Sequence, residues 1–201
     1  MLVFWKEKLV LLALPKTGTS ALEKALAPRA DIAFLSPPDV KHMPMFRYTR
    51  FIKPLFGVID GARKLETVAL VREPVSWLGS WYRYRSRAEL EGHPNSTKGQ
   101  SFDDFVAAYL EESPPPFARV GSPRRFVSNG QGNVAVSHLF QYEQIDLAAR
   151  FLESRLKTPL VLGRANVSPP ADLALAPKLR ARLEDACAEE FALWENARRP
   201  S

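Results

Sequence analysis

The first segment that could do chemistry is a short loop with one lysine, one glycine and three hydroxyl residues. It reads Pro15-Lys16-Thr17-Gly18-Thr19-Ser20 and lies between an apolar run and a predicted helix. Such a loop points several backbone N–H groups at one place, at the positive end of the helix dipole. Gly18 lets the backbone approach an oxyanion closely, Lys16 adds a mobile positive charge, and the three hydroxyls add donors. We therefore predict a binding site for a phosphate or sulfate group.

This loop differs from the Walker A motif of P-loop NTPases. That motif reads G-x-x-x-x-G-K-[ST], with the lysine directly after the second glycine. Here Lys16 precedes Gly18, and the chain contains no Gly-Lys pair. The alternative interpretation is a glycine-containing turn between a strand and a helix, in which the lysine occurs by chance.

A second apolar run, residues 67–71, ends at a positive charge. Arg72 follows it directly, then Glu73, and Ser80 lies eight residues after Arg72. In open α/β sheets, ligands bind beyond the carboxyl ends of the strands, and a guanidinium binds phosphate through two parallel hydrogen bonds. We expect Arg72 and Ser80 to converge on a second anionic group. A magnesium-dependent NTPase usually has a carboxylate at this strand end, so Arg72 indicates a nucleotide bound without metal.

The elements that must position these residues alternate along the chain. The predicted strands span residues 8–14, 32–35, 67–71, 135–142 and 160–163. The predicted helices span residues 18–27, 75–91, 101–112, 146–156 and 177–197, and Ser101 is a predicted N-cap. This alternation predicts an α/β fold, a three-layer sandwich around a mostly parallel central sheet. Residues 36–63 and 113–133 fit neither pattern and are predicted as long loops that border the ligand site.

Composition limits the classes of protein that the chain can belong to. Its 201 residues, 46% of them hydrophobic, predict a single globular domain over residues 1–201. The single cysteine, Cys187, allows no intrachain disulfide, and the apolar run 9–14 is too short for a membrane span. No small-residue cleavage site follows this run, so we expect no signal peptide. We therefore expect a cytoplasmic protein without a membrane span. The net charge of +6 favours an anionic partner.

In its motifs the chain resembles the sulfotransferases that use 3′-phosphoadenosine 5′-phosphosulfate (PAPS). Residues 15–20 resemble the 5′-phosphosulfate loop of that family, and Arg72-x-Pro74 with Ser80-x-Tyr82 resembles its 3′-phosphate motif. Residues 140–143 are similar to a later strand-end element whose tyrosine, here Tyr142, lies near the adenine. Residues 163–168, which include Arg164, are similar to an Asn-x-Ser segment of the carbohydrate-directed members. The matches occur in family order.

The resemblance implies a P-loop-NTPase-like sulfotransferase fold and the transfer of a sulfuryl group from PAPS to a hydroxyl acceptor, without a metal. The cofactor-binding residues that it implies are Pro15, Lys16, Thr17, Gly18, Thr19, Ser20, Arg72, Ser80, Tyr142 and Arg164, and Lys16 is also catalytic. Ala21 stands where the cytosolic hormone-type branch has an adenine-stacking tryptophan. The chain is therefore closer to the carbohydrate-directed and bacterial members, and the acceptor is a small molecule or a carbohydrate rather than a nucleic acid.

His42 is the candidate catalytic base, because an imidazole titrates near neutral pH and can take the proton of a hydroxyl acceptor. The resemblance places a lysine and a histidine in this segment, but Lys41 and His42 are adjacent here, whereas the family separates them by one residue. Asp39 is the alternative base. His93 and His138 are interpreted as structural.

Two other functions fit parts of the sequence. A P-loop kinase would need the Walker lysine and a magnesium ligand at the second strand end. A non-catalytic module on a degenerate sulfotransferase fold would bind a nucleotide or an acidic glycan through the basic segments 47–63 and 119–125. The sequence leaves the acceptor and the oligomeric state open.

Overall fold

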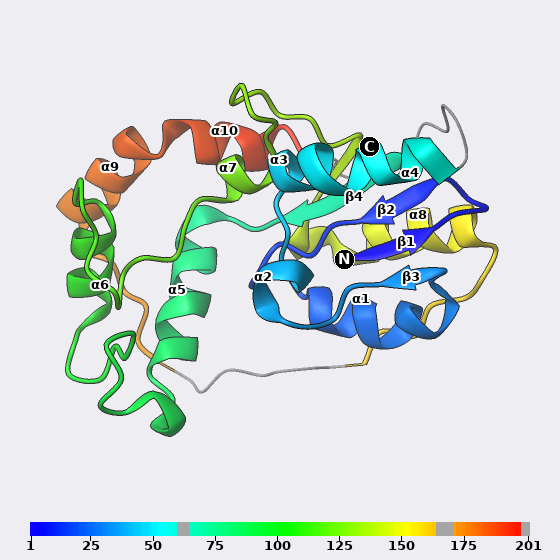
Figure 1. Cartoon of the computed structure of the whole chain (residues 1–201). Coiled ribbons are helices and arrows are strands. Elements are labelled where there is room, and N and C mark those ends of the chain that lie inside the picture. The colour runs from blue at the N-terminus through cyan, green and yellow to red at the C-terminus, as the bar shows by residue number, and fades with distance from the viewer. Residues whose placement is uncertain (60–64, 164–170, 198–201) are drawn as a thin grey trace.

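The computed structural model describes residues 1–59, 65–163 and 171–197, and these residues include a five-stranded sheet. Helices α5 Pro74–Arg85, α6 Phe102–Tyr109 and α9 Pro177–Ala186 lie to one side of the sheet (Figure 1). The strands lie in the order β3-β1-β2-β4-β5. Their bounds are β1 Leu2–Phe4, β2 Leu9–Leu11, β3 Ile32–Ala33, β4 Glu66–Val71 and β5 His138–Gln141. The predicted α/β class is confirmed.

The sheet is mixed, which corrects the expectation of a mostly parallel one. Strands β2, β4 and β5 are parallel, whereas β1 pairs antiparallel with both β2 and β3. The cause is a hairpin that the sequence analysis did not predict. The polar residues Lys6, Glu7 and Lys8 interrupt the first apolar run, and the Lys8 N–H donates to the Trp5 carbonyl, so that the chain turns back on itself.

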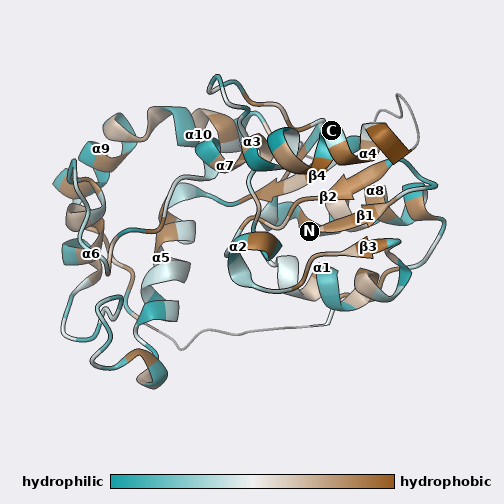
Figure 2. Ribbon diagram, in the orientation of Figure 1, coloured by the Kyte–Doolittle hydropathy of each residue, from teal (hydrophilic) through white to brown (hydrophobic). Residues whose placement is uncertain are grey.

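Helices cover both faces of the sheet. Because successive strand residues point to opposite faces, Val10 belongs to one hydrophobic cluster and its neighbours Leu9 and Leu11 to the other. The apolar strands are brown in Figure 2. The first cluster includes residues of α3 Met45–Arg47, η2 Tyr48–Ile52, α4 Lys53–Ile59 and α7 Pro123–Val127. The second includes residues of α1 Thr19–Leu26 and α8 Ile145–Leu156.

A third hydrophobic cluster lies beside the sheet rather than on it (Figure 1). It joins α5 Pro74–Arg85, α6 Phe102–Tyr109 and α9 Pro177–Ala186. The predicted N-cap is confirmed, because the Ser101 hydroxyl accepts a hydrogen bond from the Asp104 N–H and the Asp104 carboxylate accepts one from the Ser101 N–H. The predicted helix over 177–197 is instead two helices, α9 and α10 Ala188–Glu195, which meet at Cys187.

Two further expectations were wrong. Residues 160–163 form no strand, and the Leu160 N–H donates to the Glu153 carboxylate instead of to a neighbouring strand. Residues 36–59 are largely helical, since α2 Pro38–Lys41 precedes α3, η2 and α4. The missed signal was the helical spacing of the inward-facing side chains Met45, Tyr48, Ile52 and Phe56. The short helices η1 Ala27–Arg29, η3 Ala88–Leu90 and η4 Tyr142–Gln144 complete the described elements.

Across the three described ranges, no helix combines the length and the apolar character needed to cross a bilayer.

Candidate functional site

The loop of residues 15–20 connects β2 to α1 and contains two residues in the left-handed region. Lys16 has a φ of 69° and Gly18 a φ of 70°. Gly18 is the N-cap of α1 and leaves the cap without a side-chain hydrogen bond. Within the described chain, no backbone hydrogen bond engages the N–H groups of residues 17–20. These donors are therefore free to bind an anion, as the sequence predicts.

The threonine hydroxyls of the loop are directed inward. Thr17 is fully buried and its hydroxyl donates to the Leu14 carbonyl at 2.8 Å, while the Thr19 hydroxyl lies 3.5 Å from the same oxygen. These contacts fix the turn after the strand. The two hydroxyls therefore stabilise the loop rather than extend from it as the donors that we expected, whereas Ser20 is half-exposed.

Position 18 requires glycine, because the Tyr142 ring leaves no space there for a side chain. A Cβ atom added at this glycine would lie 2.7 Å from Tyr142 Cε2 and 3.2 Å from Ile145 Cδ1. Tyr142 is the first residue after β5, at the start of η4. The structure therefore brings the predicted tyrosine against the predicted loop, at the shared carboxyl edge of the parallel strands.

Arg72 joins the loop to the neighbouring strand end. It follows β4, and one of its terminal NH groups donates to the Lys16 carbonyl at 3.3 Å. Its guanidinium also lies over the Tyr142 ring, 4.7 Å from the centroid. Burial, as the largest effect, lowers the pKa of Arg72. The two cations that the sequence analysis expected at one ligand thus lie at adjacent strand ends.

The hydroxyl that contacts Arg72 is that of Ser76, which the sequence analysis did not single out. Arg72 Nε donates to the Ser76 hydroxyl at 2.9 Å. Ser80 is buried one helical turn further along α5, and the part of the chain that the structure describes shows no hydrogen bond from it to Arg72. Arg72 is held just before the first turn of α5, which is why the nearer serine is in reach.

Helix α5 also brings cations that the sequence analysis missed. Arg83 lies three residues after Ser80, on the same side of the helix, and Arg87 lies two residues beyond the end of α5. The Arg83 Nε is buried and has no hydrogen-bond partner in the described chain. The signal in the sequence was this helical spacing from a serine already expected at the site.

The Lys16 side chain extends along α5 toward these arginines. Its Nζ lies 4.0 Å from the centroid of the Tyr84 ring and 5.4 Å from that of Trp81. Burial, as the largest effect, and the nearby charges of Arg87, Arg72 and Arg83 together lower the pKa of Lys16 to about 8. We name these four residues, Lys16, Arg72, Arg83 and Arg87, the cation cluster.

None of the ion pairs among described residues neutralises the cation cluster. They involve other cations: the N-terminus, Lys41, Lys98, Arg124, His138, Arg155 and Arg180. The two carboxylates next to Arg72 have other partners, because Glu73 accepts from the Ser76 N–H, and Glu143 accepts from Trp194 Nε1 and from the Glu73 N–H. The cluster can therefore bind an external anion without first breaking an ion pair.

His42 lies at the end of α2, against the strand that leads into the loop. Its Nδ1 is 2.7 Å from the Ala13 carbonyl oxygen. A carbonyl only accepts hydrogen bonds, so Nδ1 carries the proton and Nε2 keeps its lone pair. Burial, as the largest effect, lowers the pKa of His42, which favours the neutral ring at pH 7. Lys41 points elsewhere, to the buried Glu23 carboxylate at 2.7 Å.

Three predicted residues remain, namely Pro15, Asp39 and Arg164. Pro15 is held by its carbonyl, which accepts from Trp77 Nε1 at 3.0 Å. Asp39, the alternative base, is exposed in the first turn of α2. Arg164 lies outside the described residues.

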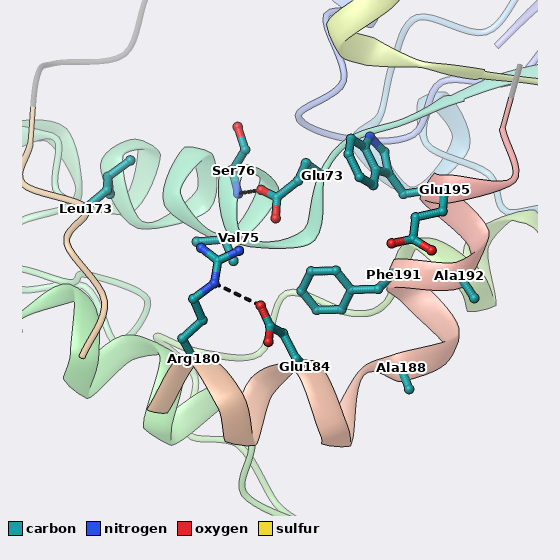
Figure 3. Close-up of a pocket in the computed structure, with 11 residues that line it drawn as sticks. Glu73, Val75, Ser76, Leu173, Arg180, Glu184, Ala188, Phe191, Ala192 and Glu195 are labelled. Atoms are coloured by element: carbon teal, nitrogen blue, oxygen red, sulfur yellow. Dashed lines mark hydrogen bonds and ion pairs between the residues drawn. The ribbon is translucent and has the colours of Figure 1, made fainter. Parts of the chain in front are cut away.

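A cavity of about 710 Å³ opens between the start of α5 and the helices α9 and α10 (Figure 3). The carboxylates of Glu73, Glu184 and Glu195 line it, and Arg180 of α9 donates at 2.8 Å to Glu184, one turn along the same helix. Ser76, the partner of Arg72, also lines this cavity. None of the predicted site residues that the structure describes does so, and the acidic lining disfavours an anion. The cavity therefore adjoins the cation cluster at Ser76 but is lined by none of its four residues.

Three comparisons with known proteins assign no family to this geometry. A scan against models of protein families, a search of curated proteins and a search of solved structures each found no match.

Proposed function

We propose that this chain is a sulfotransferase that uses PAPS, on a P-loop-NTPase-like sulfotransferase fold, and transfers its sulfuryl group to the hydroxyl of a small-molecule or carbohydrate acceptor. The observation that supports this most is the cation cluster beside the free N–H groups of the loop at residues 17–20. PAPS carries an anionic group at each end of its ribose. Cations that extend from the loop along α5 provide positive charge for both ends.

In this proposal Lys16 and the loop N–H groups bind the 5′-phosphosulfate. Their positive charge stabilises the negative charge that grows on the bridging oxygen as its bond to sulfur breaks. Arg72, Ser76, Arg83 and Arg87 bind the 3′-phosphate, and this contact distinguishes the substrate from ATP. No described hydrogen bond connects Ser80 to Arg72, so Ser80 would need a contact of its own with the 3′-phosphate.

The acceptor hydroxyl supplies the electron pair of the new bond. Its oxygen attacks sulfur in line, the bond from sulfur to the bridging oxygen breaks, and adenosine 3′,5′-bisphosphate leaves with that electron pair. The hydroxyl proton passes to Nε2 of His42, whose Nδ1–H is held by the Ala13 carbonyl. The backbone contact orients the ring, as an acceptor on the second nitrogen does in other histidine bases.

A nucleotide-binding experiment tests the substrate class. We expect adenosine 3′,5′-bisphosphate, with EDTA present, to raise the melting temperature of the protein far more than AMP does. The matched variants are Lys16→Met and Lys24→Met, since Lys24 lies in the last turn of α1, away from the loop. Stabilisation that requires magnesium would favour a kinase, and equal stabilisation by AMP would contradict the proposed 3′-phosphate contact.

A transfer assay tests the activity itself. The protein is incubated with PAPS labelled in its sulfuryl group and with separate sets of phenols, alcohols and saccharides. Label in one set of acceptors, lost in Lys16→Met and kept in Lys24→Met, is the expected result. Nucleotide binding without transfer to any set would support the non-catalytic module instead.

A further inference from the structure

Helix α4 and the turn before it present an apolar face to solvent. Phe51, Leu55, Val58 and Ile59 have exposed fractions of 58%, 54%, 86% and 65%. Their spacing places them together, opposite the inward-facing side of the same helical segment. They are half of the eight large hydrophobic side chains that are exposed within the described ranges. The last turn of α4 is brown in Figure 2. We name these four residues the α4 face.

The charges beside the α4 face are all positive within its own segment. Arg47, Arg50 and Lys53 are exposed, and no acidic residue occurs between residues 40 and 59. The Arg50 guanidinium lies over the Phe51 ring, 5.3 Å from its centroid, so cation and apolar side chain are neighbours. An apolar stripe flanked by cations is typical of helices that lie in the interface of a membrane.

The turn between β1 and β2, which contacts α4, carries two further exposed cations. Trp5 packs edge-on against Phe56, at a ring-centroid distance of 5.2 Å, which attaches the turn to the buried side of α4. Lys6 and Lys8 of the same turn are exposed, and Glu7 between them is half-buried. Exposed cations thus occur in two segments that are in contact with each other.

We propose that the α4 face docks on a membrane surface rich in anionic phospholipids. Phe51, Leu55 and Val58 enter the boundary between headgroups and acyl chains, and the flanking cations bind the lipid phosphates. This binding is peripheral and does not depend on the proposed sulfotransferase activity.

The charge pattern favours a membrane over the other occupants of such a face. If two copies of the chain associated through this face, Arg47, Arg50 and Lys53 of one copy would lie near those of the other. Residues 40–59 contain no carboxylate that could reduce the repulsion between them. A nucleic acid would use the cations but gain little from Val58 and Leu55, because these side chains offer no ring on which a base could stack.

Vesicle cosedimentation tests the proposal. The vesicles contain either phosphatidylcholine alone or phosphatidylcholine with one third phosphatidylserine. Val58→Asp is compared with Val161→Asp, because Val161 is 88% exposed and lies far from α4 in the chain. We expect binding to the phosphatidylserine vesicles only, a loss of about tenfold or more in the partition coefficient for Val58→Asp, and none for Val161→Asp. A double variant, Arg50→Gln with Lys53→Gln, should lose about fivefold for each cation removed.

Three results would overturn the proposal. The first is that the wild-type protein does not cosediment with phosphatidylserine vesicles at low salt. The second is that Val58→Asp binds these vesicles as well as Val161→Asp does. The third is a change of solution mass, in light scattering, caused by Val58→Asp without any vesicle binding, which would identify the face as a contact between copies. Circular dichroism checks the fold of each variant, and the glutamine double variant, which adds no charge, provides the readout if Val58→Asp unfolds.

Discussion

Replacing Lys16 by methionine should stabilise the free protein and remove nucleotide binding at the same time. Burial and three arginines lower the pKa of Lys16 to about 8, so the folded state holds this charge at a cost. A folded-state pKa below the ordinary value of 10.5 means that this cost is greatest below pH 8 and disappears as the pH rises to about 10.5. Methionine has a similar shape and no charge, so it removes the cost.

The gain in stability expected for Lys16→Met has an upper limit. Lys16 is partly open to solvent, so screening leaves on the order of 1 kcal/mol of the repulsion to be recovered. For a domain of this size, ~1 kcal/mol shifts the melting temperature by about 2–4 °C. We therefore expect Lys16→Met to melt a few degrees above the wild type at pH 7 without ligand. A lysine that served only to hold the fold would lower the melting temperature when removed.

The pH dependence of nucleotide binding provides the second half of this test. The charged form of Lys16 binds the anion, so the affinity for adenosine 3′,5′-bisphosphate should fall as the pH rises above about 8. One charge-assisted hydrogen bond contributes about 1.5–3 kcal/mol, which limits the total loss to roughly 10–100-fold. Isothermal titration between pH 7 and 10 measures it. Lys24→Met should retain the pH dependence, and Lys16→Arg, which stays charged, should lose it.

Either of two results would refute this reasoning: a dissociation constant that does not change over that pH range in the wild-type protein, or a melting temperature of free Lys16→Met well below that of the wild type. The first would remove Lys16 from the binding site. The second would show that its contacts with the Tyr84 and Trp81 rings hold the structure.

Three further predictions concern the neighbours of Lys16. Gly18→Ala should destabilise the protein by about 1–3 kcal/mol in urea unfolding, since its φ is positive and its Cβ would meet Tyr142, whereas Gly57→Ala, which meets nothing, should not. Arg83→Gln should weaken bisphosphate binding by about tenfold, with the exposed Arg182→Gln as the unaffected control. The pH–rate profile of transfer should have an acidic limb with an apparent pKa below 6.5, which disappears in His42→Ala; a limb that persists would exclude His42 as the base.

The sequence predicts where the candidate site lies more accurately than it predicts the contacts between the residues of that site. Arg72 and Lys16 were expected at one ligand because parallel strands end at a common edge of the sheet, and the hydrogen bond from Arg72 to the Lys16 carbonyl places the two residues side by side. The serine that contacts Arg72, Ser76, was not predicted. Spacing along the chain does not determine how a guanidinium before a helix will turn, and the structure places it on Ser76.

The errors in the fold have a similar origin. The run of residues 1–14 carries enough apolar side chains for one strand or two, and the choice depends on whether Lys6, Glu7 and Lys8 interrupt it as a turn. Residues 160–163 are apolar enough for a strand, but a strand also needs a free sheet edge in register. Such a partner is a property of the whole fold, which local pattern does not contain.

Three side chains of the cation cluster are held in place by aromatic rings rather than by carboxylates, so their positive charge is not neutralised. A buried cation paired with a carboxylate would have to exchange that partner for the incoming anion, and the exchange would reduce the net gain of binding. Here Lys16 and Arg87 lie against the face of Tyr84, and Arg72 lies over Tyr142. A ring face attracts a cation by about 0.5–2 kcal/mol without neutralising it. The aromatic residues therefore fix the positions of these side chains while leaving their charge available, so replacing Tyr84 by leucine should weaken bisphosphate binding even though this ring offers the nucleotide no charge of its own.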